Sequence, residues 1–232
     1  MSFDQYANDY REIINRVSRL SGETYESIIT LRMAVLQDEL GEQHCGTRGL
    51  VILDFGCGTG ITEQYLLEMF PDGTITGIDT SAESIRLAEQ QGLKGVSYIH
   101  CDSPHLPCPD RSFDLIYTNG TMHHIPAADR KNCLAELNRV LKPGGTLCIF
   151  ENNPRNPLTV RSMRQNPFDA DLEAVKPEEL LQLAAIVGLE SLGVRYYFFF
   201  PRLLKFLRSM ERRLKRIPLG AQYLLRLRRT ST

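Results

Sequence analysis

The chain has 232 residues, 42% of them hydrophobic and 24% charged, as expected for a globular domain with a sizeable core. The formal net charge of -1 argues against a nucleic-acid partner, and the acid-bearing N-terminus lacks the apolar core of a signal peptide. No apolar run is long enough to span a membrane, and the six cysteines form no CxxC pair, so we expect a cytoplasmic protein with reduced thiols.

Apolar residues with helical spacing predict two helices in the first part of the chain, separated at Ser21 and Gly22. From residue 50 the pattern changes to short apolar runs, which predict strands at 50–55, 74–78, 96–100, 113–118 and 146–150. Helices are expected between them at 62–69, 82–91 and 129–141. This alternation is typical of a doubly wound parallel sheet.

The last third is less regular. We expect helices at 177–187 and 203–216 and strands at 194–200 and 222–227. From Arg195 to Thr232 there are eleven Lys or Arg and one acid, so this region carries about +10 and the remainder about -11. Contact with an acidic membrane surface or a lipid-linked substrate is one interpretation of this basic C-terminal region. A solvated basic face is favoured, because the apolar side of the helix at 203–216 should cover the sheet.

A glycine-rich turn, DFGCGTG at residues 54–60, follows the first strand and opens a helix. Its glycines allow a tight turn and close approach of the backbone to a ligand. Asp79 ends the second strand, where a carboxylate can hold ribose hydroxyls, and Asp102 ends the third. The third glycine of a dinucleotide-binding loop is absent, and Asp54 would repel a pyrophosphate. A cationic cofactor is therefore favoured over a dinucleotide.

The segments VILDFGCGTG, GIDTS and LNRVLKPGGTLCIFE resemble successive motifs of the class I S-adenosylmethionine (SAM)-dependent methyltransferases, over residues 50–151. These motifs are similar to those of bacterial small-molecule methyltransferases. The resemblance implies a Rossmann-like α/β fold with a doubly wound, seven-stranded, mostly parallel sheet whose last strand is antiparallel. FDQYANDYREIINRVSRLSGE resembles the N-terminal lid of such enzymes. We therefore expect a helical lid over residues 1–45 and the methyltransferase domain over residues 46–232.

The resemblance also implies roles around SAM. The glycine loop would lie beside the methionine part, Asp79 would bind the ribose, and Asp102 would meet the adenine. Asn119 would face the sulfonium, and Arg11 the carboxylate. The alternative for Tyr10 is that it only packs the first helix. The expected cofactor-binding residues are Tyr10, Arg11, Asp54, Phe55, Gly56, Cys57, Gly58, Asp79, Thr80, Asp102, Ser103 and Asn119.

His123 and His124 follow the fourth strand and are the expected catalytic residues, because an imidazole titrates near neutral pH and can act as a general base. The alternative is that one of them packs the loop before Pro126. Beyond the fifth strand, a polar segment would suit an anionic acceptor, although a solvated loop explains it equally well. Its residues are Glu151, Asn152, Asn153, Arg155, Asn156, Arg161 and Arg164.

The function expected from these features is methyl transfer from SAM to a small-molecule acceptor. An anionic acceptor is one form of this expectation. Two alternatives stay open: a SAM-binding protein that does not methylate, and SAM chemistry of another kind on the same fold. A nucleic-acid methyltransferase is disfavoured, because no Asn/Asp-Pro-Pro-Tyr/Phe motif follows the fourth strand. No metal is expected, since the spacing of His100, Cys101, His105 and Cys108 fits no common zinc pattern.

Overall fold

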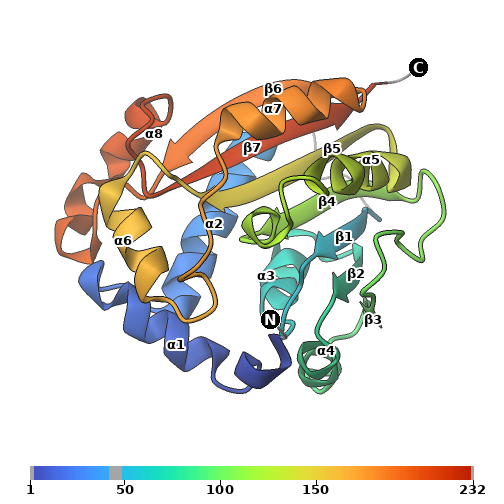
Figure 1. The fold of residues 1–232 in the computed structure, drawn as a ribbon, viewed down its shortest axis with the longest axis horizontal. Coiled ribbons are helices and arrows are strands. Elements are labelled where there is room, and N and C mark those ends of the chain that lie inside the picture. Colours follow the sequence, from blue (N-terminus) through green and yellow to red (C-terminus); the bar gives the residue numbers. More distant parts are fainter. Residues whose placement is uncertain (1–2, 42–48, 231–232) are drawn as a thin grey trace.

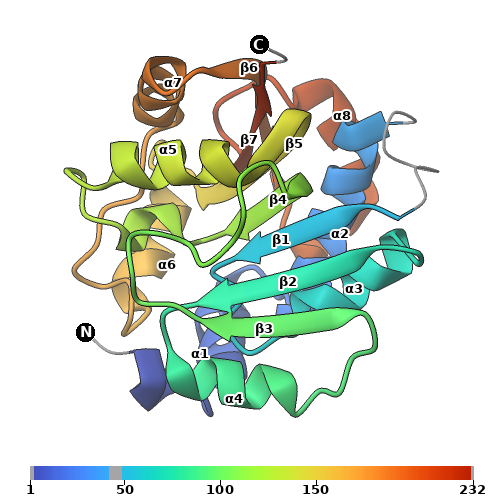
Figure 2. The same cartoon turned by 90° about the vertical axis from the view of Figure 1, so that its right-hand side faces the viewer.

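The computed structural model describes residues 3–41 and 49–230. Its centre is a seven-stranded sheet with the strand order β3-β2-β1-β4-β5-β7-β6, covered by helices on both faces (Figures 1 and 2). The strands are β1 (Val51–Phe55), β2 (Thr74–Asp79), β3 (Val96–His100), β4 (Phe113–Asn119), β5 (Leu141–Asn152), β6 (Leu189–Tyr197) and β7 (Gln222–Arg229). β7 runs antiparallel to both of its neighbours, whereas the first five strands pair in parallel. The expected Rossmann-like sheet is thus confirmed.

The core has two parts, one on each face of the sheet. On one face, α5 (Arg130–Val140) and α7 (Pro177–Ile186) bury Leu137 and Leu180 against the strands. On the other face, α2 (Tyr25–Leu40) and α3 (Thr62–Met69) bury Leu36 and Leu66. The remaining helices of the parallel half are α4 (Ala82–Glu89), which flanks β3, and α6 (Pro157–Gln165). Apolar side chains on both faces explain the continuous apolar runs of β1 and β4.

The N-terminal segment divides between the core and the edge of the sheet. α2 belongs to the core, because Ile29, Met33 and Leu36 pack against the strands. The short 3-10 helix η1 (Phe3–Tyr6) contacts α4, and α1 (Tyr10–Val17), which continues into η2 (Ser18–Leu20), contacts α6. The predicted boundary between residues 45 and 46 lies outside the described residues. The expected helical lid stays a prediction, and α2 is the part of that segment that belongs to the core.

The expected helix over 203–216 is corrected by the structure. Residues Arg202–Met210 form a 3-10 helix, η5, which is irregular at Leu204, and only Glu211–Leu214 form a short α-helix, α8. Of the apolar side chains expected to cover the sheet, Leu203 and Met210 are exposed, at 87% and 47%, and the other three, Leu204, Leu207 and Leu214, are only partly buried. The reason is that α2 already occupies that face, where Ile29 and Leu36 share a cluster with Leu224 of β7. No helix in the described part of the chain combines the length and apolar character that a membrane crossing requires.

Candidate functional site

A cavity of about 620 Å³ lies at the carboxyl ends of the parallel strands. Its lining combines two kinds of surface. One side is built from the glycine loop and the ends of β1 and β2, and the other from α1, α2, the end of β5 and residues 166–169. This position matches the general rule that ligands of open α/β sheets bind beyond the carboxyl ends of the strands.

The glycine loop is held against the neighbouring strand ends. The backbone N–H groups of Gly56 and Cys57 donate to the carbonyl of Ile78 at 2.8 and 3.1 Å. Gly56 has a φ of 79°, and a Cβ there would lie 2.2 Å from Oγ1 of Thr121. Only glycine fits this position, because a side chain would meet both a positive φ and a neighbouring residue. The loop backbone therefore faces the cavity without side chains in the way.

Asp79 joins the end of β2 to this loop. Its Oδ2 accepts the backbone N–H of Gly58 at 2.8 Å, and its Oδ1 accepts that of Ser81 at 2.9 Å. Burial raises the pKa of Asp79, while the N–H groups of Ser81 and Gly58 oppose the rise. Each carboxylate oxygen offers more than one lone pair, so Asp79 can accept ligand hydroxyls besides these backbone bonds.

Asp54 is a buried carboxyl group inside the cavity lining. It is 2% exposed, and its Oδ2 has no hydrogen-bond partner among the described residues. Burial, with the nearby charges of Glu63 and Asp79, raises the pKa of Asp54 well above its usual value. Burial also raises the pKa of Glu63 to about 8, and neither of its carboxylate oxygens has a partner in the described residues. The site is therefore short of positive charge, which a cationic ligand would supply.

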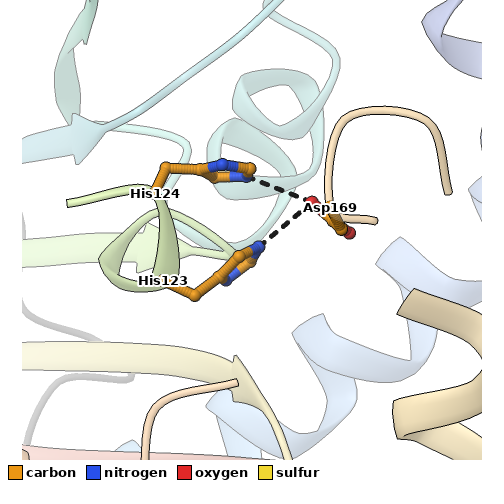
Figure 3. A group of neighbouring side chains, drawn as sticks. All are labelled: His123, His124 and Asp169. Atoms are coloured by element: carbon orange, nitrogen blue, oxygen red, sulfur yellow. Dashed lines mark hydrogen bonds and ion pairs between the residues drawn. The ribbon is translucent and has the colours of Figure 1, made fainter. Parts of the chain in front are cut away.

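Two histidines on η4 (Met122–His124), in the cavity lining, share the carboxylate of Asp169 (Figure 3). His123 Nδ1 lies 2.7 Å from Oε2 of Glu151, and its Nε2 lies 3.2 Å from Oδ1 of Asp169. His124 Nε2 lies 3.3 Å from the same Asp169 oxygen. Burial lowers the pKa of His123, but the two carboxylates outweigh it and raise the pKa to about 10. His123 is therefore charged at neutral pH and has no lone pair with which to accept a proton.

The same three side chains are the group among the described residues whose donor atoms could hold a metal ion. One ligand atom from each of His123, His124 and Asp169 lies within 4.8 Å of the other two. Nitrogen donors with a carboxylate would suit a transition metal better than magnesium, and His123 would have to lose a proton to become a ligand.

Another part of the cavity lining consists of aromatic rings and cations. Tyr10 stacks on Phe168 at a centroid distance of 5.2 Å and meets Tyr25 edge-on at 5.6 Å. Arg32 is 9% exposed, and its Nε donates to Gln222 at 3.0 Å. Arg208, the other arginine in this lining, forms an ion pair with Glu23. Arg32 is thus the cavity arginine that has no carboxylate partner in the described part of the chain.

Comparison with known proteins identifies the family of this chain. The methyltransferase domain family matches residues 52–145. An O-methyltransferase of Aspergillus nomiae is 32% identical over 157 residues, which cover 64% of this chain and 68% of that protein. The chain belongs to the class I SAM-dependent methyltransferases.

A further relative, the trans-aconitate 2-methyltransferase of Azoarcus sp. strain BH72, is 37% identical over 116 residues. The match covers 50% of this chain and 44% of that methyltransferase, so the chain spans less than half of its length. Among solved structures, the cyclase SpnF is similar with a TM-score of 0.68 at 20% identity, covering 100% of this chain and 97% of that chain. At this identity the likeness shows the fold alone.

Most of the residues expected from the sequence meet in the cavity of this methyltransferase-family chain. Those in the lining are Tyr10, Asp54, Phe55, Gly56, Cys57, Gly58, Asp79, Thr80, Asn119, His123 and His124. Arg11 lies outside the lining, where its side chain pairs with Glu26 at 2.5 Å, so the structure does not bring it to the cavity. Asp102 and Ser103 are exposed and also lie outside the lining, because the chain turns away beyond β3 and leaves Cys101 at the cavity.

The polar segment after β5 is divided. Glu151, Asn152 and Asn156 line the cavity, whereas Arg155 pairs with Glu178 at 2.9 Å. Arg161 and Arg164 line a separate pocket on the surface. The structure therefore does not bring these three arginines to the cavity.

The residues that sequence reasoning missed come from outside the recognised motifs. Three of them line the cavity: Arg32 in α2, and Phe168 and Asp169 in the segment after α6; the fourth, Glu63 in α3, is buried near Asp54. A charged residue among apolar helix positions was the available signal for Arg32 and Glu63. Nothing in the local pattern marked Asp169, whose position depends on packing between distant segments.

Proposed function

We propose that this chain transfers the methyl group of SAM to a small organic acceptor that carries an anionic group. The observation that carries the proposal is the buried Asp54, whose Oδ2 lacks a partner in the described residues and which lies beside the glycine loop in the same cavity as Arg32 and His124. SAM has both a sulfonium and an ammonium group, and either would satisfy this carboxylate.

The residues around the glycine loop fit the rest of the cofactor. Asp79, with Thr80 beside it, would hold the ribose hydroxyls, and the backbone from Phe55 to Gly58 would border the methionine part. Asn119 would lie at the sulfonium end, and Tyr10 would cover the cofactor from α1. Bound SAM supplies an activated methyl carbon, so the protein's main task is to align the acceptor with it.

The acceptor side supports an anionic group and a proton acceptor. Arg32 offers a buried guanidinium that can bind a carboxylate or phosphate. We assign the general base to His124, because its side chain is 20% exposed and lines the cavity, whereas that of His123 is 2% exposed and lies between two carboxylates. Asp169 orients His124 through its Nε2. The Azoarcus relative is named for trans-aconitate, an acceptor that carries carboxylates, which agrees with an anionic acceptor here.

Two other functions remain as outcomes of the test: SAM binding without methyl transfer, and another reaction on the same fold. The first experiment is calorimetry with SAM and with its demethylated product, followed by a metabolite-extract screen with methyl-labelled SAM. Label transfer to a small acid supports the proposal. If neither compound binds, the proposal is contradicted. Binding without label transfer favours the alternatives.

The Asp54→Asn variant tests whether the buried Asp54 contributes to SAM binding. Asn has the same shape without the charge, so SAM affinity should fall about tenfold or more. The fold should be kept, because the change removes a buried acid rather than a buried partner. Asp72→Asn, at an exposed turn, is the control and should bind SAM like the original chain. Unchanged SAM affinity in Asp54→Asn would contradict the role of Asp54.

A further inference from the structure

Most of the large apolar side chains that stay exposed gather at one end of the molecule. Six of the seven found in the described residues come from α6, η5 and the turn after α8, the seventh being Ile186. These six, here called the apolar rim, are Leu158, Leu203, Phe206, Met210, Ile217 and Leu219. In Figure 1, α6 and α8 lie at the same end, and Asn156 Nδ2 donates to the carbonyl of Leu219 at 2.8 Å. The apolar rim is larger than scattered exposure explains.

Basic side chains accompany the apolar rim. Arg202, Lys205, Arg212, Arg213 and Arg216 are all exposed. Two of these cations, Arg202 and Lys205, each directly precede an exposed apolar residue of η5, Leu203 and Phe206. The only acid between Arg202 and Arg216 is Glu211, and its carboxylate points inward to the backbone N–H groups of Phe198 and Phe200. The outer surface is therefore apolar and positively charged.

The same surface borders the cavity. Leu158 is 71% exposed and also lines the cavity, so the cavity reaches the surface at α6. Phe199, Phe200 and Pro201, which lead into η5, form another part of the lining. A molecule docked on the apolar rim would therefore lie at the entrance of the cavity.

We propose that the apolar rim and its five cations dock this protein on the surface of a bilayer that contains anionic lipids. Exposed Phe, Leu and Met side chains can enter the boundary between headgroups and acyl chains, while Arg and Lys keep their charges at the phosphates. Each cation near an anionic surface adds electrostatic attraction. Docking on the bilayer does not depend on the proposed function. Only the benefit of turning the cavity toward the bilayer rests on methyl transfer in that cavity.

A second copy of this chain fits the surface less well. Two identical copies meeting through the apolar rim would bring two sets of the same five cations together, and like charges repel. An acidic protein would match the charges. The bilayer is favoured because apolar and basic side chains alternate within one short segment, as they do in interfacial helices.

The test is co-sedimentation of the full chain with vesicles, without SAM or acceptor, so that its outcome is independent of methyl transfer. Vesicles of phosphatidylcholine alone are compared with vesicles that also contain phosphatidylglycerol. We expect binding to the anionic vesicles, weaker binding to the neutral ones, and release at about 1 M salt. Lys205→Glu with Arg213→Glu should weaken binding to the anionic vesicles about tenfold or more.

Leu203→Ser with Phe206→Ser should also weaken binding, whereas Ile186→Ser, an equally exposed apolar change on α7, should not. Thermal unfolding checks that all variants fold, as expected for exposed positions. The proposal is overturned if anionic vesicles do not bind the chain, or if the Leu203 and Phe206 variant binds them as well as the original. It is also overturned if sedimentation shows that these positions form a dimer instead, or if the charge reversal leaves binding unchanged.

Discussion

The two neighbouring histidines of the cavity differ in what surrounds them, and this difference decides their chemistry. His123 lies between Glu151 and Asp169, and its raised pKa keeps it protonated. His124 contacts Asp169 and is more exposed to the cavity. If His124 accepts a proton during transfer, His124→Ala should lower kcat about a hundredfold and leave the KM for SAM unchanged. The measurement is kcat against pH with the acceptor found by the labelled-SAM screen.

His105→Ala is the control for this change, because His105 has a side chain that is 71% exposed and lies beside Glu136, outside the cavity lining. It should retain full turnover. An acceptor that is already ionised needs no base, so full turnover by His124→Ala would remove the assignment of His124 and indicate such an acceptor.

Glu63 makes folding stability depend on pH. Burial raises its pKa from 4.5 to about 8, so the folded state holds this proton over a pH range in which the unfolded chain has lost it. The sign follows from this difference: the contribution of Glu63 to stability is fully present below about pH 4.5 and is lost as pH rises toward 8. Gln resembles the protonated acid, so Glu63→Gln should be increasingly more stable than the original chain as pH rises from 5 to 8. Urea unfolding at several pH values measures this.

The exposed Glu68 of the same helix provides the comparison, since Glu68→Gln should follow the original chain at every pH. Parallel curves for Glu63→Gln and the original chain would mean that Glu63 is ionised in the folded state. In that case the description of Glu63 as a buried acid that keeps its proton would be wrong.

At the scale of elements, the sequence predicted best where one strand or helix determines its own pattern. The glycine turn, the helix at Thr62–Met69 and the strand at Val96–His100 were all expected at these positions. β5 begins at Leu141, earlier than expected, because Lys142 to Gly145 continue the strand although they read as a turn. β6 likewise begins at Leu189 instead of 194.

The 3-10 helix η5 shows where pattern alone fails. Leu203, Leu207 and Met210 have helical spacing, and the sequence predicts an apolar face that covers the sheet. The pattern does not reveal that α2, more than 160 residues earlier in the chain, already covers the face. Asp169 and Arg32 were missed for the same reason, because contacts between distant segments bring them to the cavity.

The N-terminal helix and the segment after α6 act as one cover. Tyr10 of α1 stacks on Phe168, and the next residue, Asp169, contacts both histidines. A change in α1 can therefore reach His124 through two adjoining contacts. This linkage gives the expected lid a specific physical connection to the acceptor side of the cavity.

For the whole molecule, the uneven charge seen in the sequence is partly resolved within the chain itself. The acids of α2 and of the turn before it meet the cations of the last third: Glu23 pairs with Arg208, and Asp38 lies 3.6 Å from both Arg212 and Lys215. The basic region is therefore bound to the N-terminal region rather than being wholly solvated. The exposed cations that accompany the apolar rim form its outward-facing part, and among them Arg212 also lies near Asp38.

Glu39 is the centre of this charge network and should control global stability. Its side chain is 5% exposed and pairs with Lys215 at 2.7 Å, Arg226 at 3.0 Å and Arg195 at 3.2 Å, which joins α2 to β6, β7 and the residue after α8. Glu39→Gln leaves three cations close together without their carboxylate, so the free energy of unfolding should fall by about 3 kcal/mol. Urea unfolding measures the fall, with the exposed Glu190→Gln expected to change it by less than about 0.5 kcal/mol. A loss no larger than that of Glu190→Gln would mean that packing of α2 on the sheet, rather than Glu39, holds the two ends of the chain together.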